Sequence, residues 1–133
     1  MNHKELYELA VSARSRAYTP YSHFTVGAAL LTKSGKVYLG CNIENAAYGA
    51  VNCAERTAFF TAICEGERDF AMIAIAGGRE GEEGELCAPC GICRQVLAEF
   101  CTADLPVILG TPDDWTVHPL GELLPMAFTK QEL

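Results

Sequence analysis

The chain has 133 residues, half of them hydrophobic and a fifth charged, which fits one folded domain over residues 1–133 rather than a disordered chain. A formal net charge of −7 argues against broad contact with nucleic acid, which needs a basic face. The sequence contains no run of about 18 apolar residues, so it predicts no membrane span. The start Met1–Glu5 is too polar for a signal peptide, so the seven cysteines indicate a cytoplasmic protein whose thiols serve as metal ligands or core residues.

The first part of the chain predicts a helix followed by a strand pair. Apolar residues recur at three- and four-residue spacing over residues 3–17 and predict a helix. Pro20 ends this helix, because proline disfavours the helical conformation in the residue before it. Two β-capable runs, residues 24–31 and 37–43, are separated by a short turn. They predict an antiparallel hairpin.

The rest of the chain alternates helices with strands. In order, the pattern predicts helix 53–65, strand 70–76, helix 91–101 and strands 106–109 and 115–117. Asn52 precedes the first of these helices as a candidate N-cap, and residues 77–85, rich in glycine and glutamate, predict a surface loop. Five strands alternating with helices predict an α/β fold, a three-layer α/β/α sandwich with a mixed five-stranded sheet.

Three cysteines are candidate metal ligands. Cys53 and Cys90 stand at predicted helix starts that follow strands, where ligands gather in α/β sheets. Cys90 and Cys93 form a Cys-x-x-Cys pair that can place two sulfurs on one ion. Helix N-termini lower thiol pKa values and so favour the thiolate that a metal needs. Three ligands leave a fourth position for water, as in catalytic zinc sites.

Two residues beside Cys53 complete a catalytic pattern. Glu55 lies next to the open side of the predicted metal site and is a candidate proton carrier. Arg56 is a candidate donor to a ligand sulfur, which would offset the negative charge of three thiolates. Cys-x-Glu followed by Pro-Cys-x-x-Cys resembles the signature of the zinc deaminases.

The remaining cysteines leave one alternative open. Cys87 forms a second Cys-x-x-Cys pair with Cys90, so four cysteines could make a closed structural zinc site. Such a site would leave no position for water and no role for Glu55. Cys41, Cys64 and Cys101 are expected to be small core residues.

Five dispersed stretches resemble the small zinc-dependent cytidine deaminases of nucleoside salvage. They are residues 18–30, 40–48, 52–58, 89–95 and 122–128. The resemblance implies a cytidine deaminase-like fold with zinc on Cys53, Cys90 and Cys93. It also implies hydrolytic deamination of cytidine and 2′-deoxycytidine to uridine and 2′-deoxyuridine, with release of ammonia and with Glu55 as the proton carrier.

The same resemblance assigns the substrate-binding residues. Phe24 is expected to line the pyrimidine pocket, Asn42 and Glu44 to hold the ribose hydroxyls, and the backbone at Ala54 to read the base. Phe128 is expected to pack on the base in a neighbouring subunit's site. The implied assembly is a homotetramer with active sites at subunit interfaces.

Two rival functions stay open on the sequence. One is a blasticidin-type or nucleic-acid cytosine deaminase of the same fold. A carboxylate such as Glu44 at the 3′-hydroxyl would repel a phosphate there, which favours a free nucleoside. The other rival is a non-catalytic zinc module with four cysteine ligands, which needs a fourth protein ligand.

Overall fold

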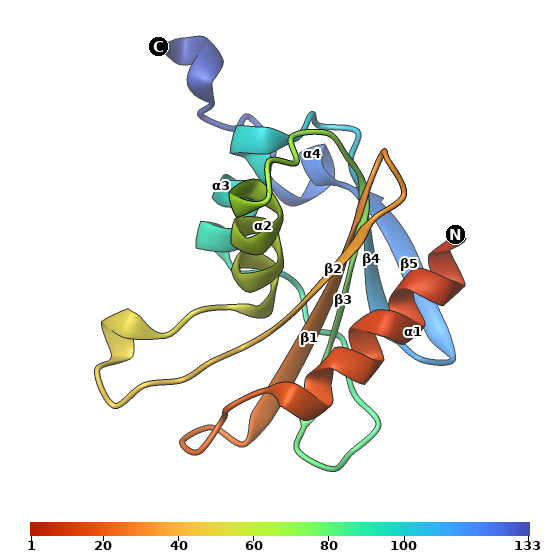
Figure 1. Cartoon of the computed structure of the whole chain (residues 1–133), viewed down its shortest axis with the longest axis vertical. Helices are drawn as coiled ribbons and strands as arrows, with labels where there is room; N and C mark the ends of the chain where they lie inside the picture. Colours follow the sequence, from red (N-terminus) through yellow and green to blue (C-terminus); the bar gives the residue numbers. More distant parts are fainter.

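The computed structural model describes residues 1–133 and is built on one mixed sheet of five strands (Figure 1). The strands are β1 (Phe24–Thr32), β2 (Val37–Cys41), β3 (Phe70–Arg79), β4 (Pro106–Thr111) and β5 (Asp114–Pro119), in the spatial order β2-β1-β3-β4-β5. β3 and β4 are parallel, and the other neighbours are antiparallel. The predicted mixed sheet and its hairpin are confirmed.

Helices cover both faces of the sheet. They are α1 (His3–Ala13), α2 (Ala54–Cys64), α3 (Gly91–Phe100) and the short α4 (Leu120–Leu123), with 3₁₀ turns at Arg14–Arg16, Tyr48–Ala50 and Lys130–Glu132. α1 lies on one face, and α2 and α3 lie side by side on the other (Figure 1). The predicted three-layer α/β/α sandwich is therefore confirmed. No helix in the structure combines the length and the apolar character needed to cross a bilayer.

Two hydrophobic cores result from the alternation of side chains along the strands. On β1, Ala28 and Leu30 belong to the core under α2 and α3, whereas Ala29 belongs to the core under α1. On β3, Ile73 and Ile75 face the first of these cores, and the alternate residues face the second. Burial of both faces explains why the β3 sequence is continuously apolar.

Glycines on the two hairpin strands allow α1 and α2 to lie directly on the sheet. A Cβ atom on Gly27 would fall 2.1 Å from the Ala10 carbonyl oxygen of α1. One on Gly40 would fall 2.3 Å from the Ala54 carbonyl oxygen, in the first turn of α2. Because Ala54 directly follows Cys53, the Gly40 contact fixes the height of a candidate metal ligand above the sheet.

Several boundaries differ from those predicted. The first helix ends at Ala13 and tightens into the 3₁₀ turn Arg14–Arg16, where the buried Arg14 side chain donates to backbone carbonyls at the ends of β1 and β3. β3 runs on to Arg79, because its last residues pair with the start of β1. The prediction of Asn52 as N-cap is wrong: Cys53 occupies that position, and Asn52 donates to the Thr57 hydroxyl instead.

Candidate metal and active site

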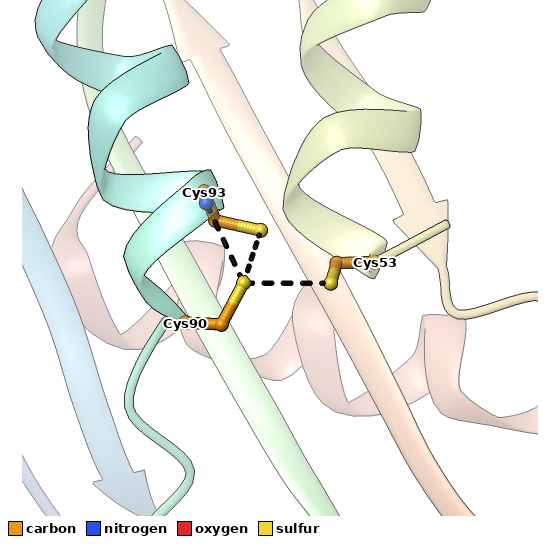
Figure 2. A group of neighbouring side chains, drawn as sticks. All are labelled: Cys53, Cys90 and Cys93. Carbon is orange, nitrogen blue, oxygen red and sulfur yellow. Dashed lines mark hydrogen bonds between the residues drawn. The ribbon is translucent and has the colours of Figure 1, made fainter. Parts of the chain in front are cut away.

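Three cysteine sulfurs converge where α2 and α3 begin (Figure 2). Cys53 is the N-cap of α2, Cys90 is the N-cap of α3, and Cys93 is buried in the first turn of α3. All three Sγ atoms lie within 4.8 Å of one another, with 3.8 Å between Cys53 and Cys90 and 3.4 Å between Cys90 and Cys93. Sulfurs on a tetrahedral zinc ion are about 3.8 Å apart, so this donor set fits zinc.

The cluster stabilises negative charge on Cys53. Donation from the Cys93 thiol, with further donation from Arg56, holds the pKa of Cys53 well below its ordinary value. The same contact with Cys53, together with burial, raises the pKa of Cys93. One member of the cluster is thus a thiolate at neutral pH, which is the form in which cysteine binds a metal.

Arg56 and Glu55 both approach the cluster from the first turn of α2. The Nη2 atom of Arg56 lies 3.3 Å from the Sγ atom of Cys53, so the guanidinium donates to a candidate ligand. Glu55 is only 5% exposed, and this burial raises the pKa of its carboxyl group. A raised carboxyl pKa moves toward neutral pH, where a group can both accept and return a proton.

A cavity of about 370 Å³ opens beside Cys53 and extends to Glu44. Its lining residues come from two loops and are Tyr21, Ser22, Asn42, Ile43, Glu44, Asn45, Tyr48, Val51, Asn52 and Cys53. Such a volume is typical of small-molecule sites. Two predicted substrate-binding residues, Asn42 and Glu44, therefore share one cavity with a candidate metal ligand.

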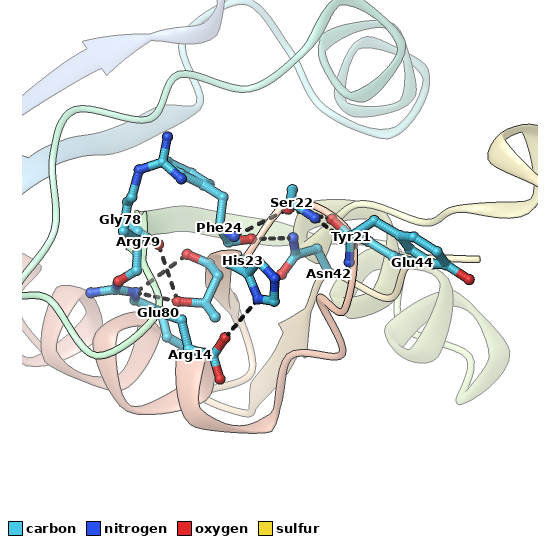
Figure 3. A network of polar contacts seen from close by, with 11 residues as sticks. Arg14, Tyr21, Ser22, His23, Phe24, Asn42, Glu44, Gly78, Arg79 and Glu80 are labelled. Atoms are coloured by element: carbon cyan, nitrogen blue, oxygen red, sulfur yellow. Dashed lines mark hydrogen bonds and ion pairs between the residues drawn. The ribbon is translucent and has the colours of Figure 1, made fainter. Parts of the chain in front are cut away.

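The polar side chains in this cavity are held in fixed orientations (Figure 3). The Asn42 Oδ1 atom accepts from the Val26 amide at 2.8 Å, and its Nδ2 atom donates to the Phe24 carbonyl at 2.9 Å. A second Nδ2 hydrogen stays available for a ligand, because a primary amide has two. Hydrogen bonds, first of all the one from the Ser22 hydroxyl, lower the pKa of Glu44 and keep it ionised.

The structure places the three other predicted substrate-binding residues outside the lining of this cavity. Phe24 begins β1, and its ring lies close enough to Gly77 for a Cβ atom there to fall 3.1 Å from the ring. Ala54 is fully buried at the start of α2, beside the sulfurs. Phe128 is 62% exposed in the C-terminal segment, where its carbonyl accepts from Gln95.

The alternative with four cysteine ligands does not form in this structure. The group of neighbouring sulfurs contains Cys53, Cys90 and Cys93 but not Cys87. Cys87 packs against the larger core, where burial raises its pKa to about 11 and keeps it a neutral thiol. Of the cysteines expected in the core, Cys101 packs there as predicted, but the prediction is wrong for Cys64, which is exposed at the end of α2.

Sequence reasoning missed the residues that orient Glu44. Its carboxylate accepts from the backbone amides of Tyr21 and Ser22 and from the Ser22 hydroxyl. Tyr21 and Ser22 lie more than 20 residues before Glu44. No periodicity or spacing in the sequence indicates this pairing, because it depends on the fold around the start of β1.

The site geometry defines a zinc-dependent hydrolytic centre, and comparison with known proteins identifies its class. Residues 1–109 match the family model described as the cytidine and deoxycytidylate deaminase zinc-binding region. The chain belongs to this family, and zinc is its metal, with the cluster Cys53, Cys90 and Cys93 suited to hold it.

Individual relatives agree with this class. The chain is 48% identical to a cytidine deaminase of Sporosarcina psychrophila over 137 residues, covering 100% of this chain and 96% of the relative. A crystal structure of the cytidine deaminase from Burkholderia pseudomallei is 51% identical, with a TM-score of 0.88, and the match covers 96% of this chain and 100% of that one. A blasticidin-S deaminase of Bacillus cereus is 28% identical over 130 residues, covering 95% of this chain and 91% of the relative.

Proposed function

We propose that this protein hydrolyses cytidine and 2′-deoxycytidine to uridine and 2′-deoxyuridine, with release of ammonia. One observation carries the proposal: a single cavity is lined by Cys53, one of the three clustered sulfurs, and by Asn42 and Glu44. The sulfur cluster suits the binding of a metal that activates water, and the polar groups of Asn42 and Glu44 suit the hydroxyls of a sugar. The relatives that match over nearly the whole chain are named cytidine deaminases, which supports this substrate.

Cys53, Cys90 and Cys93 would hold the zinc ion. When bound, zinc supplies an acidified water as the nucleophile for the ring carbon that carries the amino group. Three thiolates make the site formally anionic, which would weaken this effect. The N-termini of α2 and α3 and the guanidinium of Arg56 offset part of that charge.

Glu55 moves the protons of the reaction. Its buried carboxylate accepts a proton from the attacking water and delivers it to N3 of the pyrimidine ring. It then carries the remaining hydroxyl proton to the amino group, which leaves as ammonia. One water is consumed and one ammonia is released, so the carboxylate returns to its starting state.

Two polar residues in the cavity lining select the sugar. The carboxylate of Glu44 and the free N–H of Asn42 bind ribose hydroxyls, and the ionised Glu44 repels a phosphate at the same position. This favours a free nucleoside over a nucleotide or a nucleic acid. The net charge of −7 favours the same choice.

We further propose a homotetramer acting in pyrimidine salvage in the cytoplasm, as one catalytic domain over residues 1–133. Phe128 is exposed and lies outside the cavity lining of its own chain, which supports its packing on the base in a neighbouring subunit's site. Tyr48, at the cavity, is 75% exposed and would lie near the subunit boundary. Sedimentation at several protein concentrations tests this assembly, and a monomer with full activity would contradict it.

An ammonia-release assay combined with zinc quantification tests the function. Cytidine and 2′-deoxycytidine are expected to release one ammonia per uridine or 2′-deoxyuridine formed, from protein with one zinc per chain. Blasticidin S, cytidine 3′-monophosphate and a single-stranded oligonucleotide serve as the rival substrates. Faster turnover of any rival, or zinc without turnover of cytidine, would refute the proposal.

A further inference from the structure

We infer that Ser22 is a positioning residue, whose hydroxyl fixes the carboxylate of Glu44, the proposed sugar ligand, relative to Phe24, the residue expected to line the pyrimidine pocket. The inference rests on the proposed function, because it gives Ser22 a part in orienting the nucleoside. Figure 3 shows Ser22 between these two residues, with Asn42 beside them. Ser22 itself lines the cavity that contains Asn42 and Glu44.

Ser22 uses one hydroxyl for two contacts. Its Oγ atom donates to the Oε2 atom of Glu44 at 2.5 Å and accepts from the Phe24 backbone amide at 3.1 Å. The Oε1 atom of Glu44 accepts from the backbone amides of Tyr21 and Ser22 at 3.0 and 3.2 Å. A carboxylate has about four lone-pair positions, so three are occupied and the one left for a ligand has a fixed direction.

The backbone beside Ser22 has an uncommon conformation. His23 has a φ angle of 57°, in the left-handed region that is uncommon for residues other than glycine. Its N–H donates to Thr19 at 3.1 Å, and its carbonyl accepts from the Glu80 amide at 2.8 Å. This bend turns the Ser22 hydroxyl back onto the Phe24 amide, and such local strain is typical of functional sites.

Phe24 is fixed from its other side by Asn42. The Phe24 amide donates to Ser22, while the Phe24 carbonyl accepts from the Nδ2 atom of Asn42. Ser22, Phe24, Asn42 and Glu44 are therefore joined in one continuous set of hydrogen bonds (Figure 3). Loss of the Ser22 hydroxyl removes the link between Glu44 and Phe24. The hydrogen bond from Asn42 to the Phe24 carbonyl remains.

Ser22→Ala and Ser22→Thr test the inference with cytidine and 3′-deoxycytidine as substrates. The alanine variant is expected to raise the KM for cytidine about tenfold, as for loss of a hydrogen bond to a charged group, while kcat changes less than about threefold. For 3′-deoxycytidine, which lacks the hydroxyl that Glu44 would bind, the change in KM is expected to stay within about twofold. Ser22→Thr restores the hydroxyl and is expected to behave like the wild type. Ser15→Ala removes a hydroxyl that bonds only to Ser12 and is the matched control.

A second measurement does not depend on turnover. Carboxyl NMR titration of the Glu44 side chain is expected to show a higher pKa in Ser22→Ala than in the wild type, because the strongest hydrogen bond to the carboxylate is gone. An unchanged Glu44 pKa in Ser22→Ala, or an equal rise in KM for the two substrates, would overturn the role of Ser22. Neither result would contradict the proposed function. A wild-type protein that releases no ammonia from cytidine would overturn the proposed function, and the role of Ser22 with it.

Discussion

The Nη2 atom of Arg56 lies 3.3 Å from the Sγ atom of Cys53, so a cation from the first turn of α2 donates to the residue that caps the same helix. This contact holds negative charge on Cys53. Because the arginine is three residues further along the helix, the helical geometry itself brings the two side chains together.

Arg56→Gln is expected to weaken zinc binding about 10- to 100-fold, because it removes a hydrogen-bond donor to a ligand. Competition with a chelator of known affinity measures the change. Arg68→Gln is the control, since Arg68 donates to backbone carbonyls near the other end of α2. An unchanged zinc affinity in Arg56→Gln would contradict the role of Arg56.

Glu55→Gln is expected to keep the fold and the zinc. Its kcat is expected to fall by about 10²- to 10⁴-fold, because the amide cannot accept a proton. Ammonia release and metal analysis on the same preparation measure both properties. Glu65→Gln, at the opposite end of α2, is the matched control. Near-normal turnover of Glu55→Gln would exclude the proposed proton transfer.

Cys87→Ser is expected to retain one zinc per chain and most of the turnover, because Cys87 lies outside the sulfur cluster and is a neutral thiol. Cys90→Ser is the contrasting variant and is expected to lose the metal. Metal content after exhaustive dialysis distinguishes them. Loss of zinc from Cys87→Ser would instead support a closed site with four cysteine ligands.

Gly40→Ala and Gly27→Ala separate damage to the site from damage to the fold. Each added Cβ would collide with the backbone of a helix, α2 for Gly40 and α1 for Gly27, so each is expected to cost about 1–3 kcal/mol of stability. Only Gly40→Ala is expected to weaken zinc binding as well, because it displaces the start of α2 and with it Cys53. Urea unfolding and chelator competition measure the two effects, with Gly49→Ala, which has open space around it, as the control. Equal zinc affinity in all three variants would refute this argument.

The pH dependence of stability is expected to include a contribution from Cys101. Burial raises the pKa of this thiol to about 12, above its ordinary value of 9.0. The folded state therefore keeps a proton that the unfolded state loses, so this stabilisation is complete below about pH 9 and is lost as the pH rises toward about 12. The free energy of unfolding, measured with urea between about pH 8 and pH 11, is expected to fall less steeply with pH in Cys101→Ala than in the wild type. The two slopes are expected to differ by up to about 1.4 kcal/mol per pH unit. The exposed Cys64 supplies the control Cys64→Ala, and identical slopes for the wild type and Cys101→Ala would contradict the prediction.

The sequence predicts the layers of this fold well, because hydrophobic periodicity reports directly which residues face a core. The apolar runs of β1 and β3 both correspond to observed burial, which is nearly continuous along each strand. The ends of elements were less predictable. β3 extends through Gly77 and Gly78 because they pair with Val26 and Thr25, and two glycines carry no local preference for a strand.

The metal cluster was also predictable, since the zinc ligands lie in two short motifs at helix starts. The contacts around Glu44 were not. They depend on the left-handed backbone of His23 and on the meeting of two loops, which no single stretch of sequence encodes. Phe128 and the subunit assembly stay predictions from resemblance.

The sulfurs of Cys53 and Cys90 come from segments 37 residues apart, with the whole of β3 between them. A zinc ion on these sulfurs would act as a reversible cross-link that closes a long loop and restricts the unfolded chain. The strength of this cross-link would depend on the free zinc concentration, because a ligand that binds only the folded state stabilises it by mass action. Metal supply would therefore set how long the folded chain survives, as well as how fast it turns over its substrate.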